Sequence, residues 1–218
     1  MRQALASIFL LALTNVTVPS VWADDRADCT QTREAERSIL GCTRILKTVR
    51  LSREDRATAY YRRGIGYHDK GQYDLAIADF SQAILINRRF TNAYINRGIA
   101  YRIKGLVEHA LADHDQAILF DPRDASAYFN RGQTYQINGQ FDNAIADYNL
   151  AIVIDPKYTN AYYNRGVSYG KKDELAKAIA DYRKALQIDP SHQLARRNLM
   201  ALGVTLKTPM WMARVSRH

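Results

Sequence analysis

The sequence is constrained most strongly by a short motif that returns every 34 residues. Each copy contains a tyrosine, two variable residues, an arginine and a glycine. The four copies are Tyr60–Gly64, Tyr94–Gly98, Tyr128–Gly132 and Tyr162–Gly166. A period of this length is typical of arrays of helical hairpins, in which one unit cannot bury its apolar face alone and stacked neighbours can. We therefore expect the chain of 218 residues to form one short solenoid.

Other positions of the repeat also keep their residue type and divide each unit into two helices. Alanines follow each glycine of the motif at two fixed distances: Ala76, Ala110, Ala144 and Ala178, then Ala83, Ala117, Ala151 and Ala185. In the second unit, helices are expected at 92–104 and 107–120. Between the helices lie Gly71, Gly105 and Gly139, where glycine adopts a left-handed backbone at low cost. Proline ends a helix because it lacks the amide donor, and Pro122, Pro156 and Pro190 close the last three units.

These columns resemble the tetratricopeptide repeat (TPR). The resemblance covers residues 57–192 in four consecutive units, 57–90, 91–124, 125–158 and 159–192. Tyrosine replaces the usual tryptophan, arginine replaces the usual leucine before glycine, and His114 stands where an aromatic ring is expected. The resemblance implies an all-α fold, a right-handed α-α superhelical solenoid of helix-turn-helix TPR units.

The arginine of the motif is always followed, after sixteen residues, by an aspartate. The pairs are Arg63 with Asp79, Arg97 with Asp113, Arg131 with Asp147, and Arg165 with Asp181. Because the two positions can face each other in a helical hairpin, we interpret them as ion pairs within each repeat, with the arginine stems covering apolar surface. The alternative is a basic stripe that binds a ligand.

Residues 1–23 have the pattern of a cleaved signal peptide. Arg2 precedes an apolar run, Ala4–Leu13, and Ala23 lies where signal peptidase would cut, which would leave Asp24 as the mature start. The run is shorter than the ~20 residues of a membrane-spanning helix, so an uncleaved anchor is the less favoured alternative. We therefore expect a secreted protein without an integral membrane segment after cleavage and, in a bacterium, a periplasmic one.

The formal net charge is +9. In a cytosolic protein this charge would suggest nucleic acid as a partner. Export and the lack of a nucleic-acid-binding module argue against such a partner. The basic residues are spread along the chain, which leaves weak association with anionic envelope polymers or membrane surfaces.

The segments that flank the repeats are expected to close the solenoid. Residues 24–56 resemble a degenerate half-repeat with a helix at 35–49, and they contain Cys29 and Cys42, which we expect to form a disulfide in an exported chain. Residues 193–206 are expected to form a capping helix. The basic tail, 207–218, contains Met210-Trp211-Met212, which is either a docking peptide or a frayed terminus.

The sequence lacks the patterns that carry most enzymatic chemistry. Its five histidines and two cysteines form no recognisable zinc motif, and neither a Gly-rich phosphate loop nor a Gly-x-Ser-x-Gly elbow is present. We therefore predict a non-enzymatic protein with no cofactor and no metal.

The resemblance implies that the first helices of the units line a concave groove that binds a partner protein or an extended peptide. The predicted partner-binding residues are Tyr61, Asn92, Ile95, Asn96, Ile99, Arg102, Phe129, Asn130, Gln133, Asn160, Tyr163 and Asn164. Among them, three asparagines at one repeat position offer donors and acceptors to a peptide backbone. Some relatives bind a carboxylate through a set of clamp residues. Of those residues, only the asparagine at Asn96 is present in this chain. The predicted function is a periplasmic adaptor or scaffold. The alternative is a structural envelope protein that binds anionic polymer or membrane through its basic face.

Overall fold

The computed structural model describes residues 25–29, 34–47 and 51–204, and within these ranges all regular structure is helical. Residues 25–29 are helical, and ten longer helices follow. They are α2 (Ala35–Leu46), α3 (Arg53–Asp69), α4 (Tyr73–Ile86), α5 (Thr91–Ile103), α6 (Val107–Phe120), α7 (Ala125–Ile137), α8 (Phe141–Ile154), α9 (Thr159–Lys171), α10 (Leu175–Ile188) and α11 (Gln193–Ala201). The expected signal peptide up to Ala23 and the tail from residue 207 lie outside the described residues.

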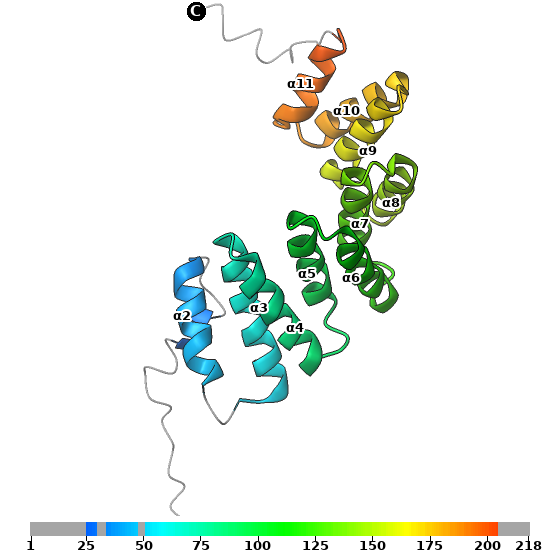
Figure 1. The fold of residues 1–218 in the computed structure, drawn as a ribbon. Coiled ribbons are helices and arrows are strands. Elements are labelled where there is room, and N and C mark those ends of the chain that lie inside the picture. Colours follow the sequence, from blue (N-terminus) through cyan, green and yellow to red (C-terminus); the bar gives the residue numbers. More distant parts are fainter. Residues whose placement is uncertain (1–24, 30–33, 48–50, 205–218) are drawn as a thin grey trace, which may run out of the picture.

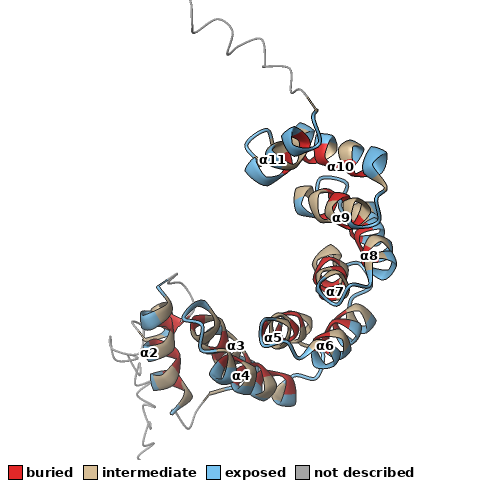
Figure 2. Cartoon of the chain, turned by 45° about the horizontal axis from the view of Figure 1, so that its top comes forward, coloured by how far each residue is buried: buried red, intermediate tan, exposed pale blue. Residues whose placement is uncertain are grey.

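The helices pair into consecutive hairpins that stack into an open arc (Figure 1). Each of α5, α7 and α9 contacts its own second helix and both helices of the preceding hairpin. In Figure 2 the first helices, α3, α5, α7 and α9, lie along the inside of the arc, and α4, α6, α8 and α10 lie outside. The prediction of an all-α TPR-type solenoid is confirmed.

Close approach of the two helices in each hairpin depends on the small-residue columns. A Cβ atom added to Gly132 would lie 2.8 Å from the Tyr148 ring, and one added to Gly64 would lie 2.7 Å from the Phe80 ring. Both alanine columns are fully buried, with Ala110 and Ala144 at 0% exposure. Any larger residue would therefore push the helices apart, which explains why these positions repeat without variation.

The turns inside the hairpins confirm the expected left-handed glycines, with one exception. Gly71, Gly105 and Gly139 have φ angles of 71°, 75° and 76°. The fourth turn carries Asp173 instead, with φ of 59°, and it is the one non-glycine residue with positive φ in the described part of the chain. The left-handed conformation costs about 1–2 kcal/mol for most L-residues and is better tolerated by aspartate.

Each of the four motif arginines binds two elements at once, and we call these four residues the arginine ladder. In the third hairpin, Nε and Nη2 of Arg131 donate to both carboxylate oxygens of Asp147 at 2.8 and 2.7 Å, as the sequence predicted. The remaining nitrogen, Nη1, donates to Asp115 of the preceding hairpin at 2.6 Å. The corresponding acceptors are Thr43 for Arg63, Ser81 for Arg97 and Asn149 for Arg165. The ladder therefore joins the repeats as well as closing each hairpin.

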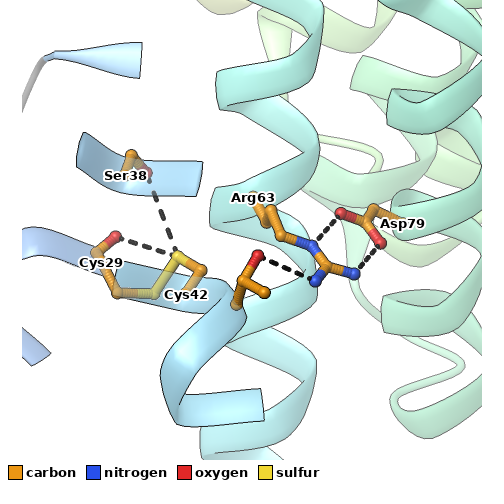
Figure 3. The surroundings of a disulfide bond; sticks show 6 residues. Cys29, Ser38, Cys42, Arg63 and Asp79 are labelled. Atoms are coloured by element: carbon orange, nitrogen blue, oxygen red, sulfur yellow. Dashed lines mark hydrogen bonds and ion pairs between the residues drawn. A yellow bond between two sulfur atoms is a disulfide. The ribbon is translucent and has the colours of Figure 1, made fainter. Parts of the chain in front are cut away.

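The N-terminal segment occupies the place of a preceding repeat. Cys29 and Cys42 are joined by a disulfide and are 1% and 0% exposed. Helix α2 then presents Thr43, whose Oγ1 accepts a hydrogen bond of 3.1 Å from Arg63, in the region that Figure 3 shows. The helix expected at 35–49 ends at Leu46, and residues 48–50 lie outside the described ranges.

The ends of the array differ slightly from the expected boundaries. Helix α3 begins at Arg53, before the expected unit boundary at 57, because Ser52 caps it by accepting a hydrogen bond from the Asp55 amide. At the other end, α11 packs against α10 through Ala195 and Leu199, both 0% exposed. Within the described residues, the helices are too short or too polar to cross a membrane.

The arginine ladder yields a test of its structural role in Arg131. The Asp147 side chain is 4% exposed and that of Asp115 is 53% exposed. An unpaired group in the buried position carries a desolvation cost, so Arg131→Ala and Asp147→Ala should each destabilise. The double variant should lose about 1–3 kcal/mol less than the sum of the two. For Arg131 with Asp115, exposure limits the coupling to about 0.2–1 kcal/mol. Chemical unfolding of the two cycles measures both values, and equal couplings would contradict the difference in burial.

Candidate functional site: the concave face

The predicted partner-binding residues all lie on the first helices, but they differ in accessibility. Asn92 and Asn160 are exposed. Ile95, Phe129 and Asn130 are buried, at 5%, 8% and 8% exposure. The half-buried members are Tyr61, Asn96, Ile99, Arg102, Gln133, Tyr163 and Asn164. The accessible part of the predicted surface therefore consists mainly of amides and Arg102.

One column of predicted contacts serves mainly to pack successive repeats together. The ring of Phe129 lies 5.8 Å from that of Tyr148 in its own hairpin and 4.8 Å from that of Tyr158 before the next hairpin. Tyr61 and Tyr163 make the same kind of double contact, and Ile95 packs with Ala117 and Ala127. Such rings fix the angle between neighbouring hairpins and present little free surface to a ligand.

The three asparagines at one repeat position, Asn96, Asn130 and Asn164, use their amide groups internally. Nδ2 of Asn96 donates to the hydroxyl of Tyr61 at 2.9 Å. Nδ2 of Asn130 and of Asn164 donates to the carbonyl of Ser126 and of Asn160, at 2.8 and 2.9 Å. These bonds fix the orientation of the side chains, so Oδ1 of Asn96 and Asn164 remains as a positioned acceptor. Binding of a peptide backbone by this column stays a prediction.

A cavity of about 320 Å³ opens where α5, α7 and α9 meet their turns. Its lining consists of Arg102, Gln133, Gln136, Ile137, Phe141, Asn164 and Lys171. Three of these, Arg102, Gln133 and Asn164, belong to the predicted site. Ile137, Phe141 and Lys171 were missed because they lie at helix ends, outside the repeat positions that the family pattern associates with ligands. The charged and amide groups of the cavity can form hydrogen bonds with a ligand, and Ile137 and Phe141 add apolar surface.

Arg102 is electrostatically unlike the ladder arginines. Its Nε is buried and has no hydrogen-bond partner, and no ion pair joins it to any residue in the described ranges. Burial lowers the pKa of its guanidinium. The structure therefore keeps a partly desolvated cation at the cavity without an internal carboxylate.

His114 also carries unsatisfied polar atoms. It is 0% exposed, and neither ring nitrogen has a hydrogen-bond partner. It occupies the position of Phe80, Tyr148 and Tyr182, with its ring against Gly98. Burial lowers its pKa to about 3, and the positive charges of Arg102 and Arg131 act in the same direction. The imidazole is thus neutral and serves as a ring in the helix–helix packing.

No cluster of three or more His, Cys, Asp or Glu side chains that could hold a metal ion occurs among residues 25–29, 34–47 and 51–204.

The stacked helical hairpins, with their concave inner face, define an α-solenoid. The tetratricopeptide repeat model matches residues 57–90, 125–158 and 159–192, and a second TPR repeat model matches 98–139. The chain therefore belongs to the tetratricopeptide repeat family. No curated protein matches it.

Solved structures share the same architecture. The crystal structure of YrrB, described as a TPR protein with an unusual peptide-binding site, has a TM-score of 0.64 and 26% identity, covering 83% of this chain and 90% of that one. MamA from Desulfovibrio magneticus RS-1 has a TM-score of 0.68 and 18% identity, covering 79% and 96%. A thermophilic TPR protein from Thermus thermophilus has a TM-score of 0.64 and 22% identity, covering 77% and 89%. The last two establish likeness of fold alone.

The buried His114 predicts a pH-dependent loss of stability. Its pKa falls from 6.5 to about 3 on folding. Between these values the unfolded chain binds a proton that the folded chain does not, so stability decreases as the pH falls below about 6.5. His114→Phe should remove this effect and, between pH 7 and pH 4.5, lose about 2 kcal/mol less than the wild type. Urea unfolding at the two pH values measures the difference. If both proteins lose the same stability, the histidine does not titrate as the structure implies.

Proposed function

We propose that this chain is a non-catalytic adaptor that binds an extended segment of a partner protein along the concave face formed by α3, α5, α7 and α9. The proposal is carried by a contrast between two kinds of arginine, those with internal partners and one without. The ladder arginines are saturated by internal partners, whereas the cavity on the concave face keeps the unpaired Nε of Arg102. Unpaired, partly buried polar groups at a concave surface are typical of binding sites.

The peptide-binding site in the description of YrrB supports the same kind of role for this chain. Binding of anionic polymer through a basic face is less favoured, because all four ladder arginines have acidic partners within their hairpins. Their charge is compensated and contributes little to a polyanion-binding surface.

Site-specific crosslinking tests which face binds the partner. A photoreactive benzoylphenylalanine at Gln133, on the concave side, should yield a discrete crosslinked protein in cells that express the chain. The matched control is Val153 on the outer helix α8, which is 76% exposed and should yield no such product. An equal or stronger product from Val153 would show that the partner binds the convex face and would contradict the proposal.

We further propose that the adaptor is exported and acts in the periplasm, on the evidence of Arg2, the apolar run and Ala23. Mass spectrometry of the protein purified from the periplasmic fraction should give a chain that begins at Asp24. A cytoplasmic protein that retains Met1 would contradict export.

A further inference from the structure

The cavity on the concave face contains two cations without an internal counter-ion. Arg102 has no ion pair in the described part of the chain, and the same holds for Lys171. Other cations at the turns are compensated: Lys104 pairs with Asp74, and Lys172 pairs with Asp142 and Glu174. Among the residues that the structure describes, no carboxylate lines the cavity. Keeping a desolvated guanidinium without an anion costs free energy, which a bound anion would recover.

A neutral donor in the cavity, the amide of Gln136, is also held in place for an anionic ligand. Oε1 of Gln136 accepts a hydrogen bond of 2.6 Å from the hydroxyl of Tyr148. This bond fixes the amide so that its Nε2, a donor only, is left for a ligand. Because Tyr148 is 0% exposed and packs under the motif glycine, the side chain of Gln136 is held by the core of the fold.

Apolar surface lies beside these donors. Ile137 and Phe141 line the cavity next to Gln136, and Ile137 is 65% exposed. We propose that this cavity binds a carboxylate of the partner segment between Arg102 and Lys171, with an apolar side chain next to that carboxylate packed against Ile137 and Phe141. That the ligand is a polypeptide rests on the proposed function. The present inference adds which chemical groups of that polypeptide the cavity binds.

The proposed site uses residues different from those of the known carboxylate clamp. At the clamp positions this chain has Tyr61, Ile65, Ser126 and Asn130 instead of the required residues. The cavity lies instead at the C-terminal ends of the first helices. The helix dipole places partial negative charge there, about half an elementary charge per helix. The turn amide of Gly139 bonds to the carbonyl of Gln136 and offsets part of it, and the two full positive charges outweigh the remainder.

Binding of two pairs of N-acetylated hexapeptides, the first pair also amidated at the C-terminus, to the purified full chain tests the proposal. In the first pair, a central Leu-Glu is compared with Leu-Gln. In the second, a C-terminal leucine with a free carboxylate is compared with its amide. At least one acidic peptide should bind about tenfold more tightly than its neutral counterpart, as expected for a charge-assisted hydrogen bond. The pair that shows the preference identifies the carboxylate as a side chain or a chain terminus.

Three variants locate the binding site. Arg102→Gln and Lys171→Gln should each abolish the preference for the acidic peptide, whereas Lys172→Gln, a change at the neighbouring lysine that does not line the cavity, should retain it. Lys171 is exposed, so its variant remains informative if Arg102→Gln fails to fold. Equal binding of acidic and neutral peptides, no binding of either acidic peptide at millimolar concentration, or equal effects of the two lysine variants would overturn the carboxylate site. A crosslink from Gln133 would still support the adaptor, so the two proposals fail separately.

Discussion

The arginine ladder is the polar interaction that recurs in every hairpin of the array and joins each one to the element before it. A guanidinium has three nitrogens in one plane, and two of them bind the aspartate of the same hairpin. The third, Nη1, points along the array and binds a side chain of the preceding hairpin. A lysine could not replace this arrangement, because its single nitrogen cannot reach two carboxylate oxygens and a third acceptor in fixed directions. The unusual arginine before the motif glycine is therefore a structural feature of this array.

The ladder also explains how the array can begin without a complete repeat. The first arginine, Arg63, finds its third acceptor in Thr43 of α2. The disulfide between Cys29 and Cys42 holds residues 25–29 against α2. Without α2, the guanidinium of Arg63 would keep its bond to Asp79 and expose its remaining donor to water. The N-terminal segment thus satisfies the same hydrogen-bonding requirement as a preceding repeat while using a shorter piece of chain.

The sequence was sufficient to predict the helices, the hairpin turns and the pairing of arginine with aspartate, because each depends on residue types at fixed distances along one unit. The expected helix at 92–104 differs from α5 by one residue at each end. Contacts between units were harder to predict. The third acceptor of the ladder is Thr43, Ser81, Asp115 or Asn149, so no single residue type marks the position. The burial of Phe129 was not evident either, since it depends on how closely the next hairpin approaches through Tyr158.

The concave cavity includes a repeat position whose residue differs in every unit. The position that holds Arg102 in the second unit holds His68, Gln136 and Gly170 in the others. Columns that keep one residue type are accounted for by packing, as with the glycines under the rings and the arginines of the ladder. A column that changes in every unit is not restricted to one side-chain size by close packing, and each side chain takes its role from its local surroundings. Gly170 meets no neighbour closer than the Tyr182 hydroxyl, at 3.8 Å from an added Cβ atom. Two members of this column, Arg102 and Gln136, line an open cavity at one place in the arc, and Lys171 adds a second positive charge to its lining. At this position, variation between the repeats of a single chain thus gives one part of the concave face a chemistry that the other units lack.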